Sequence, residues 1–236
     1  MSTALDALQQ RIGYTFRDRA LLTTAVTHLS YVADHPAAGE SNQRLEFLGD
    51  AVLQILMAEA LFDLFPNERE GVLSKRRAAL VNGTFLAQLA REIQLDHCLR
   101  LGASEETCGG RTRVSSLGDA FEALVGAVYR DSDIDRARRV VFDLYGPLAE
   151  RLANVEDFEN PKGRLQELVQ PRHGNQAVRY EVVCATGEDH AREFEVAVYL
   201  TDRLYGTGRG TSKKQAEEAA ARAALTALKE HGLEAE

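Results

Sequence analysis

Apolar residues follow a helical period over the first two thirds of the chain. They recur at spacings of three and four in four long segments, Leu21–Leu29, Leu45–Leu61, Leu80–Ile93 and Leu117–Tyr129. Such spacing places apolar side chains on one face of a helix. Ser115 and Ser116 precede the last segment and are its expected N-caps. This part of the chain is therefore predicted to be all-α.

The period shortens to two after an acidic stretch at Asn154–Glu159. Two strands are predicted by alternating apolar residues, namely Tyr180, Val182 and Cys184, and then Phe194, Val196, Val198 and Leu200. Gly187–Asp189 is the expected turn between them, and Leu204–Gly210 is predicted as a third, Gly-rich strand.

Two helices are predicted on either side of these strands. Asn160 and Pro161 favour a short helix before them, and an Ala-rich helix follows at Ser212–Lys229. The order α-β-β-β-α predicts a small α+β domain. We therefore expect a multi-domain chain: an all-α domain at 1–153, a linker at 154–160 and the α+β domain at 161–230.

Two pairs of acidic residues lie within the apolar helical segments. Glu46 and Asp50 are four residues apart, and Asp119 and Glu122 are three apart, so each pair shares a helical face. Carboxylates beside an apolar stripe are costly to bury unless a cation compensates them. The pattern therefore predicts a four-carboxylate metal site in a helical bundle.

The ligand type indicates which metal and which chemistry to expect. Hard oxygen ligands suit Mg²⁺ or Mn²⁺, and the lack of a His/Cys cluster argues against zinc. Such ions support phosphodiester hydrolysis by lowering the pKa of bound water and by clamping phosphate oxygens. Without metal, close carboxylates are expected to repel one another and to take up protons.

Several motifs resemble a known family when they are taken together and in order. The segment Asn42–Ala51 reads NQRLEFLGDA, and it is similar to the NERLEFLGD signature of the ribonuclease III family. Four further segments resemble that family in the same order: Ala25–Tyr31, 71–82, Gly109–Arg111 and Leu117–Leu124. Pro161–Glu167 and Gly206–Glu217 resemble the two characteristic segments of the double-stranded-RNA-binding domain.

The resemblance to bacterial ribonuclease III implies both a fold and an activity. It implies an all-α endonuclease domain followed by a double-stranded-RNA-binding domain. It implies metal-dependent cleavage of double-stranded RNA to 5′-phosphate and 3′-hydroxyl ends, with roles in ribosomal RNA precursor and messenger RNA processing. It also implies a homodimer with Mg²⁺ as cofactor, for which Mn²⁺ can substitute.

The resemblance also assigns roles to individual residues. Glu46, Asp50, Asp119 and Glu122 match the metal-site acids, with Asp50 and Glu122 expected to be the most critical for catalysis. Phe47 is the expected dimer contact. The residues expected to contact RNA are Gln43, Glu70, Gln166, Glu167, His190, Lys213 and Lys214. For the two lysines this also follows from their place at a helix N-terminus, where free N–H groups and the dipole favour phosphate.

One position departs from the family motif, and it leaves an alternative open. The family usually has Glu where this chain has Gln43, which keeps the size and loses the charge. A non-catalytic double-stranded-RNA binder that retains the fold is the alternative that this change supports. A phosphohydrolase acting on small molecules is a further alternative, against which the C-terminal module argues. His28 is expected to be a packed, hydrogen-bonded residue.

Composition narrows these expectations further. The 236 residues carry a net charge of −8, so RNA contact must depend on local basic clusters and not on overall charge. No apolar run approaches the ~18 residues of a membrane span. The N-terminus lacks the pattern of a secretory signal. Three widely spaced cysteines suit neither a disulfide framework nor zinc. We expect a cytoplasmic protein with no membrane partner and no small-molecule cofactor.

Overall fold

The fold was analysed in a computed structural model, which describes residues 2–174, 177–186 and 193–231. The chain divides into two compact units, Met1–Leu152 and Ala153–Glu236. Each unit has its own hydrophobic core. The expected turn at Gly187–Asp189 lies outside the described residues.

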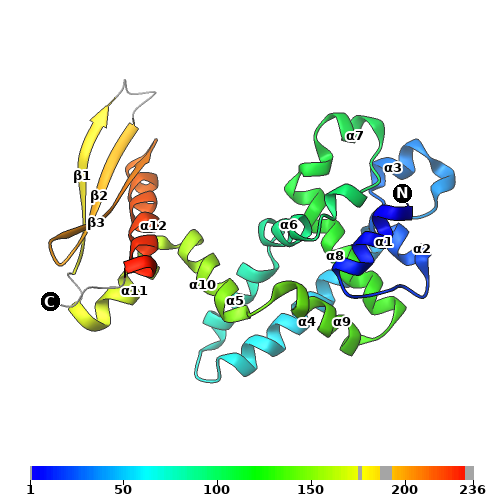
Figure 1. Cartoon of the computed structure of the whole chain (residues 1–236), viewed down its shortest axis with the longest axis horizontal. Helices are drawn as coiled ribbons and strands as arrows, with labels where there is room; N and C mark the ends of the chain where they lie inside the picture. The colour runs from blue at the N-terminus through cyan, green and yellow to red at the C-terminus, as the bar shows by residue number, and fades with distance from the viewer. Residues whose placement is uncertain (1, 175–176, 187–192, 232–236) are drawn as a thin grey trace. The chain divides into compact units, whose positions relative to one another are not determined.

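The first unit is helical throughout (Figure 1). Its helices are α1 Ser2–Arg11, α2 Arg19–Ala25, α3 Leu29–Asp34, α4 Gln43–Leu64, α5 Glu70–Val81, α6 Gly83–Glu92, α7 Ala103–Thr107, α8 Val114–Asp131 and α9 Ile134–Tyr145. Three short 3₁₀ turns lie at Pro36–Ala38, Asp96–Cys98 and Gly110–Thr112. Helix α10, Leu148–Glu159, crosses the boundary between the units and contains most of the expected linker. Among the described helices, none has the length and apolar character required to cross a membrane.

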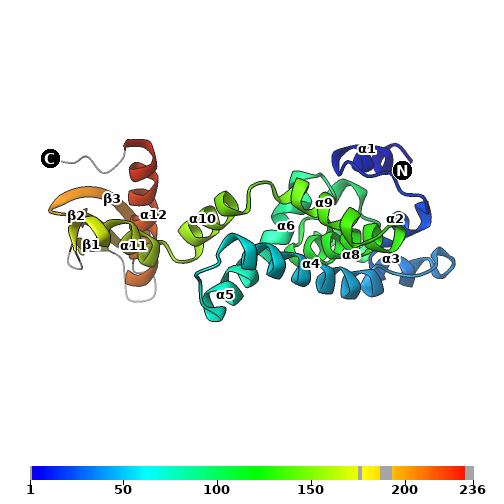
Figure 2. The ribbon, with the colours of Figure 1, turned by 90° about the horizontal axis from the view of Figure 1, so that it is seen from below.

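Helix α8 is the centre of the first unit. It packs against α2, α4, α6 and α9, and it lies beside α4 in Figure 2. Its residues between Ser116 and Val128 are all buried except the two acids, Asp119 and Glu122. Small residues such as Gly118, Ala123 and Gly126 allow neighbouring helices to approach closely. The predicted all-α fold of this unit is confirmed.

Two of the predicted helical segments are interrupted in the structure. Leu80–Ile93 was predicted as one helix, but Asn82 adopts an extended conformation with φ −73° and ψ 153°. Its side-chain oxygen accepts the N–H of Phe85 at 2.9 Å, so Asn82 ends α5 and caps α6. Likewise α2 ends at Ala25 and α3 begins at Leu29. Apolar spacing persists across both breaks, and periodicity alone therefore could not reveal them.

The prediction that Ser115 and Ser116 cap α8 is wrong. The helix begins at Val114 with Arg113 as the N-cap residue, so Ser115 and Ser116 already lie in its first turn. Ser116 is buried at 4% exposure. The preceding 3₁₀ turn at Gly110–Thr112 ends at Arg113, which is also the N-cap residue of α8, so the helix begins before the two serines.

The second unit has the predicted order α-β-β-β-α, which is confirmed (Figure 1). Helix α11 spans Pro161–His173, and the antiparallel strands are β1 Val178–Thr186, β2 Glu193–Leu200 and β3 Arg203–Gly210, in the order β1-β2-β3. Helix α12, Lys213–His231, packs against β2 and β3. Ser212 caps it by accepting the N–H of Gln215 at 3.2 Å. Gly208 permits this close packing, because a Cβ there would lie 2.1 Å from the backbone nitrogen of Ala220.

A β-bulge interrupts the alternation that was predicted for the first strand. Val182 pairs with Val196, but the next pair is Cys184 with Glu195, so Val183 has no partner. Because side chains alternate along a strand, the extra residue moves Cys184 to the face opposite the core. Cys184 is exposed, whereas the predicted inward residues of β2, Val196, Val198 and Leu200, are all buried.

Candidate metal centre

Three of the four predicted acids meet between α4 and α8. Glu46 lies in the first turn of α4, and Asp119 and Glu122 lie one turn apart on α8. One carboxylate oxygen from each lies within 4.8 Å of the others, and all three side chains are partly buried. Residues more than seventy positions apart in sequence thus form one acidic cluster, which is a property of the tertiary fold.

The cluster forms because α4 and α8 cross at two glycines. A Cβ on Gly49 would lie 1.7 Å from the carbonyl oxygen of Glu122, and one on Gly126 would lie 2.2 Å from that of Leu45. Only glycine permits backbones to approach this closely. The crossing is next to Glu46 and Glu122 in sequence, so the contact that joins the helices also sets the separation of their acids.

Burial and mutual repulsion raise the pKa values of these acids. For Glu122, burial and then the charges of Asp50, Glu46 and Asp119 raise the pKa to about 7. For Glu46, burial is again the largest cause of a raised pKa, followed by Asp119 and Asp50. The pKa of Asp119 is also raised by burial, although His28 partly offsets this. The direction of these pKa shifts agrees with the proton uptake expected of crowded carboxylates.

Asp50 stands slightly apart from the other three acids. It lies one turn after Glu46 on α4 and accepts a hydrogen bond from the side-chain amide of Gln54 at 3.2 Å. It does not belong to the group within 4.8 Å, but its charge raises the pKa of both Glu46 and Glu122. It therefore borders the cluster and is available as a further oxygen ligand.

The donor set fits a hard divalent cation. All the clustered atoms are carboxylate oxygens, which Mg²⁺ and Mn²⁺ prefer. A cation here would also offset the burial and the mutual repulsion that together raise the pKa of Glu122. The arrangement is thus suited to binding metal and to acting on a phosphate group.

The remaining residues predicted for the first unit lie outside this cluster. Gln43 is exposed at the start of α4, where its amide oxygen is 3.4 Å from the Ser41 hydroxyl. Glu70 is the exposed first residue of α5, and it accepts a hydrogen bond from the Ser74 hydroxyl at 2.9 Å. Neither side chain is buried, so both are accessible to a ligand.

The residues predicted to contact RNA from the second unit lie on its helices. Gln166 and Glu167 are exposed on α11, and Lys213 and Lys214 are the exposed first two residues of α12. Glu167 is 3.5 Å from the guanidinium of Arg164. His190 lies outside the described residues.

Sequence analysis missed most of an exposed apolar face on α4. Phe47, Ile55 and Phe62 are 80%, 60% and 70% exposed, and Ala51 between them is also exposed. Their spacing of four, four and seven places them on one side of the helix. The opposite side carries the core residues, such as Leu53 and Leu56. The available signal was that α4 is apolar on both sides, which a helix at a protein surface normally is not.

Known proteins match both units of the chain. Residues 18–147 match the family described as Ribonuclease-III-like, and residues 161–228 match the double-stranded RNA binding motif. The chain belongs to the ribonuclease III family. It is a double-stranded-RNA-specific endoribonuclease, and its second unit binds double-stranded RNA. Family membership together with the assembled acids decides against the non-catalytic alternative.

Individual relatives match almost the whole chain. Ribonuclease 3 of Pseudomonas aeruginosa (strain LESB58) is 48% identical over 232 residues, which cover 97% of each chain. Ribonuclease 3 of Bdellovibrio bacteriovorus is 43% identical over 93% of this chain and 94% of its own length. A solved nuclease domain of ribonuclease III from Campylobacter jejuni is 38% identical, with a TM-score of 0.56. It covers 59% of this chain and 94% of that domain.

Proposed function

We propose that this ribonuclease hydrolyses both strands of duplex RNA with Mg²⁺ held by Glu46, Asp119 and Glu122, and with Asp50 beside them. The observation that supports this proposal is the convergence of three carboxylates within 4.8 Å. Mn²⁺ is expected to substitute, because it accepts the same oxygen ligands.

The protein residues supply charge and position. A bound divalent ion supplies a water of lowered pKa and neutralises charge on the phosphate. Burial and the neighbouring acids raise the pKa of Glu122 to about 7, so metal binding is expected to compete with protonation of this carboxylate below that pH. Gln54 fixes one oxygen of Asp50 by donating from its amide. Attack of water on phosphorus with departure of the 3′ oxygen leaves the 5′-phosphate and 3′-hydroxyl ends that the family produces.

Replacing Glu122 tests the metal site. Glu122→Gln removes one ligand charge and keeps the size, so the fold and duplex binding are expected to remain. Cleavage at ordinary Mg²⁺ is expected to fall by at least about 100-fold. The matched control is Glu150→Gln, which removes an exposed acid outside the cluster, on α10. Full cleavage by the Glu122 variant, or cleavage by the natural protein in excess chelator, would refute the proposal.

We further propose that the enzyme is a homodimer joined through the exposed face of α4, defined by Phe47, Ala51, Ile55 and Phe62. The described residues of one chain form one such acidic cluster, whereas cutting two strands in one event requires two. A two-fold axis supplies the second cluster. Large exposed apolar side chains on one face are typical of interaction surfaces. The solved Campylobacter jejuni nuclease domain is described as structurally flexible in a region involved in dimer formation.

A charge introduced at Phe47 tests the dimer. Phe47→Asp is expected to convert the protein to monomers at micromolar concentration and to abolish coupled cleavage of both strands. Val183→Asp is the matched control, since Val183 is also an exposed apolar residue, at 60%, but lies in the other unit. Sedimentation velocity distinguishes the two variants. A Phe47 variant that stays dimeric would rule out this face as the interface.

We propose that RNA contacts come from both units. Gln43 and Glu70 are expected to contact RNA near the acid cluster, and Gln166, Glu167, Lys213 and Lys214 to contact it from the second unit; His190 is a further candidate. Exposed lysines at the start of a helix favour phosphate, and domains of this type read the shape of A-form duplex with little base specificity. The net charge of −8 makes such local contacts necessary.

The family relationship also suggests a setting in the cell. We propose roles in ribosomal RNA precursor and messenger RNA processing, in the cytoplasm. Three free cysteines, Cys98, Cys108 and Cys184, are consistent with a reducing compartment. The proposed domain limits are 1–153 and 161–230, with 154–160 joining them. Limited proteolysis of the purified protein tests these limits.

A further inference from the structure

An ion pair joins the two helices of the second unit. Nζ of Lys162, the second residue of α11, lies 2.5 Å from Oε2 of Glu217, in the second turn of α12. The Glu217 side chain is only 15% exposed, and that of Lys162 is 38% exposed. Salt screens such a sheltered pair less than it screens an exposed one. The Lys162–Glu217 pair therefore connects the start of α11 to the start of α12.

The ring of Tyr180 on β1 gives the lysine a second partner. Nζ of Lys162 lies 4.8 Å from the centroid of that ring, at a distance where a cation is attracted to an aromatic face. Tyr180 itself packs against the core of the unit. The Lys162 ammonium is thus held by a carboxylate from α12 and a ring from β1, so its position is defined by two separate elements.

The pair also leaves Lys213 without a partner on its own helix. Glu217 follows Lys213 by four residues, a spacing at which opposite charges on a helix commonly pair. The carboxylate pairs with Lys162 instead, and Lys213 forms no ion pair with any residue that the structure describes. By contrast, Lys214 lies 3.9 Å from Glu218 at the same spacing. The Lys213 ammonium therefore remains available to a phosphate.

Each member of the pair lies one helical turn from a residue proposed to contact RNA. Gln166 follows Lys162 by four residues on α11, and Lys213 precedes Glu217 by four on α12. Residues at this spacing share a helical face, with roughly 5–6 Å between their Cβ atoms. Helices α11 and α12 also pack directly against each other. The pair is therefore the polar contact nearest to both of these proposed RNA-binding side chains.

We propose that Lys162 and Glu217 are positioning residues for duplex binding, because their ion pair fixes the spacing between Gln166 on α11 and Lys213 on α12. Neither needs to touch RNA for this role. An A-form duplex presents its minor groove and its phosphates at a fixed separation, and side chains that are already spaced to match it lose less freedom on binding. The proposal rests on the RNA contacts proposed above for the second unit.

Two substitutions of Glu217 that change charge equally test this role. Glu217→Gln and Glu217→Ala each remove one negative charge, so electrostatic attraction to RNA rises equally in both. Only Gln keeps a side-chain oxygen that can accept the Lys162 ammonium. Ala is the best helix former, so α12 is expected to remain intact. Charge alone predicts equal duplex affinity, whereas the proposal predicts that the Ala variant binds about 5-fold or more weakly than the Gln variant.

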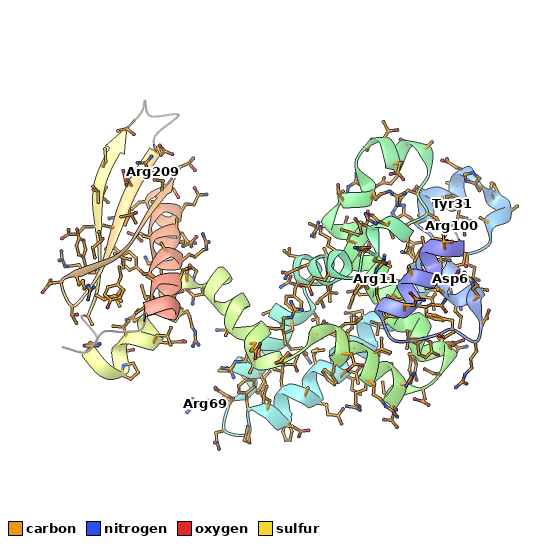
Figure 3. The ribbon with its side chains drawn as sticks, viewed as in Figure 1. Asp6, Arg11, Tyr31, Arg69, Arg100 and Arg209 are labelled. Atoms are coloured by element: carbon orange, nitrogen blue, oxygen red, sulfur yellow. The ribbon has the colours of Figure 1, made fainter. Side chains whose placement is uncertain are left out.

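Glu195 provides the matched control. Its carboxylate lies 3.2 Å from the guanidinium of Arg209, which is labelled on β3 in Figure 3. Gly208 and Gly210, on either side of Arg209, face α12, since a Cβ on either would clash with that helix. Side chains alternate along a strand, so Arg209 and Glu195 lie on the opposite face of the sheet. Glu195→Gln and Glu195→Ala are therefore expected to bind duplex RNA with equal affinity.

The experiment measures affinity and stability separately. Duplex affinity of the full-length protein is measured by fluorescence anisotropy in chelator, at a temperature where circular dichroism shows each variant to be folded. Unfolding midpoints are measured in urea. A pair with only a structural role would lower the midpoint of Glu217→Ala and leave the affinity of the folded protein equal to that of Glu217→Gln.

Equal affinity of the two Glu217 variants would therefore overturn the proposal. A difference of the same size between the two Glu195 variants would overturn it as well, because the effect would not be specific to the helix pair. Lys213→Ala is measured in parallel. Wild-type affinity in that variant would overturn the proposed RNA contact of α12 itself, and the positioning role with it.

Discussion

Gly49→Ala is the substitution that tests most directly how the fold builds the acid cluster. A Cβ at this position would lie 1.7 Å from the carbonyl oxygen of Glu122. An ordinary carbon–oxygen contact needs roughly 3.4 Å, so α4 and α8 would have to separate by about 1.5 Å or more. The cluster oxygens lie within 4.8 Å of one another across the same crossing, and such a displacement is large on that scale.

Two consequences are expected. Overpacking of a core typically costs about 1–3 kcal/mol of stability. Misplacement of catalytic groups by about 1 Å can cost about 100-fold in rate. We therefore expect Gly49→Ala to unfold at lower urea concentration, and to cleave duplex RNA at least about 100-fold more slowly at saturating Mg²⁺.

Gly83→Ala is the matched control, because a Cβ there would have no atom within 4 Å. It is expected to retain wild-type cleavage and stability. Measurements are made on full-length protein under conditions where circular dichroism shows each variant to be folded. A Gly49 variant with wild-type cleavage and stability would refute the idea that this crossing sets the distance between the acids.

Three further predictions concern charge at named positions. In chelator, the raised pKa of Glu122 means that the native state holds a proton that the unfolded chain has already released, so stability falls as pH rises from about 4.5 to about 7. At pH ~8 the free energy of unfolding of Glu122→Gln should therefore exceed that of wild type by on the order of 1 kcal/mol, after allowance for solvent screening. Urea titrations should show this difference vanish near pH ~4.5. Replacing Lys213 and Lys214 with Ala should weaken duplex binding equally across sequences and reduce the slope of log affinity against log salt by about one to two; an unchanged slope would place the phosphate contacts elsewhere. Gln43→Glu should change the cleavage rate by less than about tenfold, since Gln43 lies outside the acid cluster, and restoration of an inert natural protein by this change would contradict our interpretation.

The sequence determined the elements and the chemistry of this protein to a large extent. Helical spacing up to residue 150 and alternation from Tyr180 onward predicted an all-α unit followed by an α-β-β-β-α unit, and both are confirmed. The spacing of Glu46 with Asp50, and of Asp119 with Glu122, was enough to predict paired acids on helical faces. These features are local, because a side chain's face within one element depends only on the period of that element.

The tertiary structure decided where elements stop and what they meet. Apolar periodicity continues through Asn82, although the chain turns there, and the bulge at Val183 moves Cys184 away from the core. The separation of the acids depends on Gly49 pressed against the backbone at Glu122, and their raised pKa values depend on burial and on one another. A sequence pattern records which side chains are apolar or charged. It does not record which distant backbone they contact, and that contact sets both the distances between the acids and the free energy of ionising them.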